Sequence, residues 1–226
     1  MLIAQCTLIS DMPRAVQIPS MTRKLLNQTS PTRQEVLEHG WNPADCSASM
    51  DLLADDPLTV KRRPVPRSTD GVRGRQNYTR GVHAWEIRWP RGDRGSHAMV
   101  GVSNDRQVLH CTGYSKLVGS SLNSWGWHVD SATAFHDGKG TSAHLAFPPF
   151  KEFSGIDYPK PGAVALESFD TMIMVLDMEA GTLAYMVNNI YLGTAFSGLQ
   201  GPLYPMISCT WGDAGVVAER LLCILG

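Results

Sequence analysis

Turn-forming residues recur along most of this chain and leave room only for short elements between them. From His39 onward, runs rich in β-forming residues are separated roughly every eight to twelve residues by Gly, Pro, Asn or Asp. The 226 residues include 21 Gly and 14 Pro, which is above average usage. This spacing indicates many short strands rather than long helices, and it is typical of an all-β sandwich or barrel.

Several runs carry a clear strand pattern. Between Val82 and Trp89 every second residue is aromatic, imidazole or aliphatic, so two tryptophans share one face and should pack on the core. The uniformly apolar run 98–102 predicts an interior strand. Turns after 178 and 187 predict a three-stranded antiparallel meander from Thr171 to Phe196. A final strand pair is predicted at 203–210 and 216–222.

The first 38 residues differ from the rest of the chain. Pro13, Pro19 and Pro31 interrupt them, and they show no sustained periodicity. We therefore predict a mostly irregular N-terminal extension at 1–38 and a single domain at 39–226. One short helix is expected from Pro31 to Glu38, with Ser30 as its cap.

Charge and cysteine content exclude several functional classes. Twenty Lys and Arg face 21 Asp and Glu, so no basic field is available to hold a nucleic acid or an anionic membrane. No run approaches the roughly 18 apolar residues of a membrane span, and the opening residues lack the basic start of a signal peptide. The five cysteines are scattered without a Cys-x-x-Cys pair, which predicts neither a disulfide framework nor a metal site. A cytoplasmic location, which can include the nucleus, follows.

The sequence carries no recognisable catalytic or cofactor-binding signature. The nearest paired carboxylates are Asp177 and Glu179, which a sandwich-fold glycosidase could use, although their place at a turn favours ordinary solvated side chains. Trp125 and Trp127 could stack on a sugar but are better interpreted as core, and His83 as a hydrogen-bonded core histidine. We predict a protein that is not an enzyme and has no cofactor, with a carbohydrate-binding or hydrolysing sandwich as an alternative.

The segment from Arg62 to Arg67, Arg-Arg-Pro-Val-Pro-Arg, combines three arginines with two prolines. Prolines stiffen a loop, and we expect its guanidinium donors to be poorly satisfied by their neighbours. On composition alone a binding loop and a solvated turn are equally good interpretations.

A series of motifs in order along the chain, from about residue 39 to 222, resembles one known family. They are His39-Gly40-Trp41-Asn42-Pro43, Arg62-Arg63-Pro64-Val65, Ser68-Thr69-Asp70-Gly71, Gly81-Val82-His83-Ala84-Trp85-Glu86-Ile87, the run 94–102, Ser124-Trp125-Gly126-Trp127, the run 175–183, the run 191–196, Leu203-Tyr204-Pro205 and Trp211-Gly212. Together they resemble the SPRY domain of the SPRY domain-containing SOCS box proteins.

This resemblance implies a fold and a function. The fold is a bent β-sandwich of two antiparallel sheets. The SPRY domain grips a short peptide of the form acidic residue, Ile or Leu, then three Asn. A C-terminal SOCS box recruits elongin B and C and a cullin, so that the target is ubiquitinated and degraded.

The family's peptide site, carried over residue by residue, falls on loops at one end of the sandwich. The resemblance implies an apolar floor from Tyr114, Leu117 and Trp211, with the Arg62 to Arg67 loop as a polar clamp. The full set is Arg62, Pro64, Pro66, Arg67, Ser96, Tyr114, Leu117, Thr210, Trp211 and Gly212.

The chain departs from the family pattern in three places. Pro66-Arg67 stands where most members have Ala-Gln, so a group that only donates replaces an amide that also accepts. Ser96 and Thr210 replace the usual Thr and Val. The sequence ends at Gly226, directly after the last predicted strand, and leaves no room for a SOCS box. A peptide-binding scaffold or competitor without ligase recruitment is therefore an alternative expectation.

Overall fold

The computed structural model describes residues 34, 38–138, 156–157, 169–188 and 190–210. About half of these residues form strands, which are joined by turns and one short 3-10 helix. In chain order the elements are β1 (Trp41–Cys46), β2 (Met50–Leu52), β3 (Val60–Arg62), β4 (Ser68–Gly74), β5 (Val82–Arg88), η2 (Arg91–Asp93), β6 (Met99–Ser103), β7 (His110–Thr112), β8 (Ser124–His128), β9 (Thr133–His136), β10 (Ile156–Asp157), β11 (Thr171–Asp177), β12 (Thr182–Val187), β13 (Ile190–Ser197) and β14 (Tyr204–Cys209).

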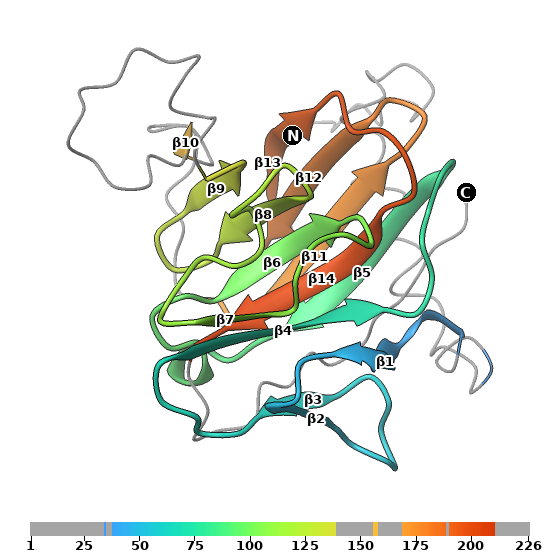
Figure 1. Ribbon diagram of the computed structural model, residues 1–226. Coiled ribbons are helices and arrows are strands. Elements are labelled where there is room, and N and C mark those ends of the chain that lie inside the picture. The colour runs from blue at the N-terminus through green and yellow to red at the C-terminus, as the bar shows by residue number, and fades with distance from the viewer. Residues whose placement is uncertain (1–33, 35–37, 139–155, 158–168, 189, 211–226) are drawn as a thin grey trace, which may run out of the picture.

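The strands form two main antiparallel sheets (Figure 1). The larger sheet has the order β1-β4-β14-β6-β8-β9-β10, with β7 pairing with β4 outside this path. The smaller sheet has the order β13-β12-β11-β5, and β2 and β3 form a separate hairpin. The predicted all-β, two-sheet antiparallel sandwich is confirmed.

The main core lies between the two sheets and is rich in aromatic residues. Trp85 on β5, Trp127 on β8 and Tyr185 on β12 are all fully buried, and the rings of Trp127 and Tyr185 lie 5.0 Å apart. The Tyr185 hydroxyl donates a hydrogen bond of 2.9 Å to the carbonyl of Val100 on β6, which satisfies its polar end and ties the sheets together. The prediction that the tryptophan-bearing face of the strand from Val82 to Trp89 packs on the core is therefore confirmed.

A second, smaller core cluster covers the other face of the large sheet. It consists of Met99, Leu117, Val118, Phe135 and Met206. The segment after β7 reaches this face by passing close over β8. A Cβ atom on Gly126 would lie 2.6 Å from the carbonyl oxygen of Val118, so only glycine permits this approach. This packing brings the 113–118 segment to the large sheet.

Most predicted elements agree with the structure. The strand at 98–102, the meander and the strand at 203–210 are confirmed as β6, β11 to β13 and β14. Gln34 and Glu38 are helical, but the rest of the predicted helix at 31–38 and the strand at 216–222 lie outside the described residues. No helix in the described part of the chain is long and apolar enough to cross a membrane.

Candidate functional site

Pairing within the large sheet brings several predicted site residues to the same end. Cys209 at the end of β14 pairs with Asp70 near the start of β4, and Ser208 pairs with Met99 at the start of β6. The loop before β4, the residues before β6 and Thr210 after β14 must therefore emerge side by side. This is the left-hand end of β4 and β14 in Figure 1.

Arg62 holds the loop before β4 from within. Its Nε atom donates to a carboxylate oxygen of Asp70 at 2.8 Å, and the two side chains are only 1% and 0% exposed. Its other nitrogens donate to the carbonyl oxygens of Arg63, Val65 and Ser68, at 2.8 to 3.1 Å. The expectation of poorly satisfied donors is wrong for Arg62. Its guanidinium points inward and shapes the loop from beneath.

Asp70 is the centre of a buried polar network that sequence reasoning missed. Its two oxygens accept hydrogen bonds from the hydroxyls of Ser47 and Ser68, both at 2.6 Å, and Oδ1 lies 3.0 Å from Nδ1 of His110. Burial acts to raise the pKa of Asp70, but these three hydrogen bonds and the charge of Arg62 outweigh it and hold the pKa below its ordinary value. The carboxylate is therefore ionised and fixes the start of β4.

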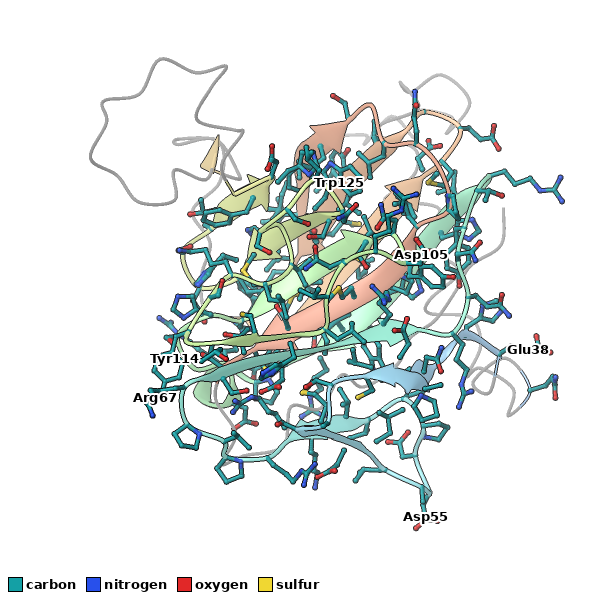
Figure 2. The ribbon with its side chains drawn as sticks, in the orientation of Figure 1. Glu38, Asp55, Arg67, Asp105, Tyr114 and Trp125 are labelled. Atoms are coloured by element: carbon teal, nitrogen blue, oxygen red, sulfur yellow. The ribbon has the colours of Figure 1, made fainter. Side chains whose placement is uncertain are left out.

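Arg67 adopts a backbone conformation that is unusual for its residue type. Its φ is 51°, in the left-handed region, which costs a non-glycine residue about 1–2 kcal/mol. Two hydrogen bonds hold it there, one of 3.2 Å from its backbone N–H to the Tyr114 hydroxyl and one of 2.8 Å from the Gly113 N–H to its carbonyl. Figure 2 shows Arg67 and Tyr114 side by side at this end of the molecule.

Tyr114 is the exposed aromatic residue of this region. It is 57% exposed although its segment is tied down. The Thr69 hydroxyl on β4 donates to the carbonyl of Gly113 at 2.7 Å and accepts from the N–H of Ser115 at 2.9 Å. An exposed aromatic ring on a backbone segment that is held by hydrogen bonds is the arrangement expected of an interaction hot spot.

The other described members of the predicted set fall into an exposed group and a buried group. Pro64, Pro66 and Arg67 are exposed on the loop before β4. Leu117 is only 2% exposed within the smaller core cluster, so it supports the surface from below. Ser96 is exposed, and its hydroxyl lies 3.1 Å from the hydroxyl of the buried Thr210.

The structure thus brings Arg67 to Tyr114 and Ser96 to Thr210. Trp211 and Gly212 lie outside the described residues. Thr69, Asp70 and His110 complete the support of the site, although no sequence pattern marked them beyond the Ser-Thr-Asp-Gly run at 68–71. Single polar residues in a strand do not reveal which neighbour they will meet.

The alternative carboxylate pair has a structural role. Asp177 is buried rather than solvated, and its Oδ1 accepts from the N–H groups of Glu179 and Ala180 at 3.0 and 2.9 Å. Glu179 accepts from the N–H of Gly81 at 2.8 Å. These contacts stabilise the turn between β11 and β12. His83 is a buried core histidine, with Nε2 2.6 Å from the carbonyl of Arg80, and burial lowers its pKa.

Comparison with known proteins assigns the chain to a family. The SPRY domain model matches residues 82–220. SPRY domain-containing SOCS box protein 2 from Mus musculus is 42% identical over 200 residues, covering 88% of this chain and 71% of the relative. This chain belongs to the SPRY domain-containing SOCS box protein family. Protein gustavus from Drosophila melanogaster is 38% identical over 225 residues, covering 96% of this chain and 76% of the relative.

Solved structures agree on the fold. The TRIM65 PSpry domain superposes with a TM-score of 0.55 at 20% identity, covering 88% of this chain and 98% of that one. The SPRY domain of human HERC1 has a TM-score of 0.54 at 17% identity and covers 81% of this chain and 99% of that one. Family membership makes this SPRY chain a protein-interaction module and not an enzyme. The resemblance inferred from the sequence motifs is confirmed.

Proposed function

We propose that this SPRY chain recognises a short linear peptide of a target protein at the loop end of its large sheet. The observation that carries this proposal is the exposed Tyr114 ring, held against the backbone of Arg67 on a loop locked from beneath by Arg62 and Asp70. Such a surface needs little ordering before it binds, so a small contact area can give useful affinity.

The chemistry of the exposed groups fits a peptide with an acidic residue, Ile or Leu, and three Asn. The face of Tyr114 can cover the aliphatic side chain. Arg63 and Arg67 are exposed and can meet the carboxylate, although Arg63 also pairs with Asp51 at 3.3 Å. The hydroxyls of Ser96 and Thr210 can exchange hydrogen bonds with asparagine amides. Trp211 and Gly212 belong to the proposed site through the family resemblance.

Arg67 also suggests how the preference of this chain differs from that of its family. A guanidinium donates hydrogen bonds but cannot accept them, whereas the amide usual at this position does both. The site should therefore favour peptides that present carbonyls or carboxylates here. Substituting Arg67 by Gln should shift the preference back toward the asparagine-rich peptide.

Calorimetry with an Asp-Ile-Asn-Asn-Asn peptide tests the site. Tyr114→Ala should weaken binding by about thirtyfold, or about 2 kcal/mol, because it removes an anchoring ring. Trp211→Ala should act in the same direction. Tyr191→Ala, on β13 of the other sheet, is the matched control and should bind as the wild type does. Equal binding by the Tyr114 variant and the control would rule out this surface.

We further propose that the chain delivers its target to an elongin B/C and cullin ubiquitin ligase. The support is family membership, since the relative from Mus musculus is named for a SOCS box. The test is copurification of elongin B and C with the tagged chain from cells. Failure to copurify would confine this chain to peptide binding, as a scaffold or competitor.

A further inference from the structure

A cluster of basic side chains borders the proposed peptide site next to Ser96. It comprises His97, Lys116 and His128, which come from three separate segments, and we call it the cationic corner. The rings of His97 and His128 meet edge to face with centroids 5.9 Å apart. The Lys116 ammonium lies 5.0 Å from the ring centroid of Phe135.

The cationic corner is continuous with the predicted site through Ser96. Nδ1 of His97 lies 2.8 Å from the Ser96 hydroxyl, which in turn lies 3.1 Å from the hydroxyl of Thr210. A peptide that reached Ser96 and Thr210 would therefore have its next residues beside His97. His97 is half-buried and Ser96 is exposed, so the approach is open among the described residues.

His128 positions the corner rather than recognising a ligand. It is buried, its Nε2 lies 3.0 Å from the carbonyl of Ser96, and its Nδ1 accepts from the N–H of Ser131 at 3.1 Å. A nitrogen that accepts carries no proton, so the imidazole is neutral with Nε2 as its donor. Burial also lowers the pKa of His128. It therefore fixes the backbone of Ser96 and supports His97 from beneath.

The charge balance of the corner favours an added anion. Burial lowers the pKa of His97, and the positive charge of Lys116 lowers it further. Burial also lowers the pKa of Lys116. Of the described acidic groups, Asp130 acts on His128, and it is also held by Arg94 through a contact of 3.2 Å. Positive charge is thus costly here, and a carboxylate or phosphate would reduce that cost.

We propose that the cationic corner binds an anionic side chain of the target, a carboxylate or a phosphate, that flanks the peptide held at Ser96 and Thr210. His97 and Lys116 are the recognising groups, and His128 is a positioning residue. This inference rests on the proposed peptide recognition and adds a second determinant of specificity to it.

Binding of such an anion must depend on pH. A negative group beside His97 favours the imidazolium form, so the pKa of His97 is higher in the complex than in the free protein. Complex formation then takes up a proton, and affinity rises as the pH falls through the pKa of the bound state. Added salt should reduce this gain in affinity for the anionic group, because the contacts are partly exposed.

The test compares extended peptides by calorimetry. Asp-Ile-Asn-Asn-Asn is lengthened at either end by a short segment that carries Ala, Asp or phosphoserine. One acidic extension should bind about three- to tenfold tighter than its alanine counterpart, with a larger gap at pH 6 than at pH 8. Phosphoserine exceeding Asp would identify a phosphate as the preferred group, and the reverse a carboxylate.

Two variants test whether this difference in affinity depends on the cationic corner. The double variant His97→Gln, Lys116→Gln should abolish the difference between acidic and alanine extensions. Arg106→Gln also removes a cation, but on the exposed loop after β6, at the opposite end of that strand, and should keep the difference. A gap that is absent in the wild type, or that survives in the double variant, would overturn the inference.

Failure of the anion site can be distinguished from failure of the proposed peptide recognition. Alanine-extended peptide that binds and depends on Tyr114 supports the site whatever the corner does. Should no peptide bind, NMR titration of the His97 imidazole with and without inorganic phosphate, at constant ionic strength, decides the matter. Its midpoint should move to higher pH relative to the signal of His136 on β9, and equal behaviour of the two histidines would refute an anion site.

Discussion

An arginine–aspartate pair holds the loop at each end of β4, but the two ends expose different residues. Near its start, the buried Arg62 pairs with Asp70 and donates to three backbone carbonyls. Near its end, Arg73 pairs with Asp45 through two contacts of 2.5 and 2.8 Å. Arg73 also donates to the carbonyls of Asn104, Asp105 and Gln107. Each arginine thus fixes the shape of a loop that has no regular structure of its own.

The difference lies in burial and in what the loop exposes. Arg62 and Asp70 are almost fully enclosed, whereas the Asp45 side chain is 27% exposed. The first end exposes Tyr114 beside Arg67, and the second exposes the charged side chain of Asp105, far from them in Figure 2. An arginine–aspartate pair therefore supplies rigidity at both ends, fully buried at the first and partly exposed at the second, and the exposed residues decide which end can recognise a partner.

The largest expected effect is on stability at the Arg62 end. Asp70→Asn removes the only carboxylate that pairs with Arg62 among the described residues, and leaves the guanidinium charge buried. The free energy of unfolding should fall by about 3–5 kcal/mol, as measured by urea denaturation. A loss below about 1 kcal/mol would mean that the pair does not organise this end.

Asp45→Asn is the matched substitution at the other end. Its cost should be smaller, about 1–2 kcal/mol, because solvent can reach the site and the Arg73 guanidinium keeps its three carbonyl partners. Equal losses from the two variants would contradict the distinction drawn between the ends.

Acid should reduce the difference in stability between the wild type and Asp70→Asn. The pKa of Asp70 is held below its ordinary value, so its contribution to stability is present above the unfolded pKa of about 3.9 and is lost as pH falls through the lower folded pKa. The stability gap between wild type and Asp70→Asn should therefore narrow below about pH 4. Denaturation curves between pH 7 and pH 3 measure it, and a constant gap would argue against an ionised Asp70.

The smallest expected effect concerns the backbone of Arg67. Its left-handed φ is easier for glycine than for any residue with a Cβ atom. Arg67→Gly should be more stable than Arg67→Ala by up to about 1 kcal/mol, although both lack the guanidinium. Thermal unfolding compares the two variants, and a more stable alanine variant would show that the conformation is not strained.

The sequence predicted the fold well because the fold depends on repeated local patterns. Alternation along Val82 to Trp89 marked an inward face, and the turns after 178 and 187 marked the meander. Which strands become neighbours is not a local property. Pairing of β14 with both β4 and β6 could not be read from periodicity, and this pairing brings the separate loops of the site together.

The site was predicted less completely for the same reason. The run from Arg62 to Arg67 was expected to present poorly satisfied guanidinium donors, but Arg62 turns inward to pair with Asp70 on β4, the next strand along the chain. Leu117 likewise belongs to the smaller core cluster rather than to the exposed surface. Burial and charge pairing between distant residues decide which members of a motif remain available to a partner.

Amide chemical-shift mapping with the Asp-Ile-Asn-Asn-Asn peptide tests the central claim most directly. The account predicts that shifts concentrate at residues 63–70, 96–97, 113–118 and 208–210, around Tyr114 and Arg67, while residues 104–107 at the other end of β4 change little. Shifts centred on residues 104–107, or on β13 of the smaller sheet, would place recognition elsewhere and contradict the account.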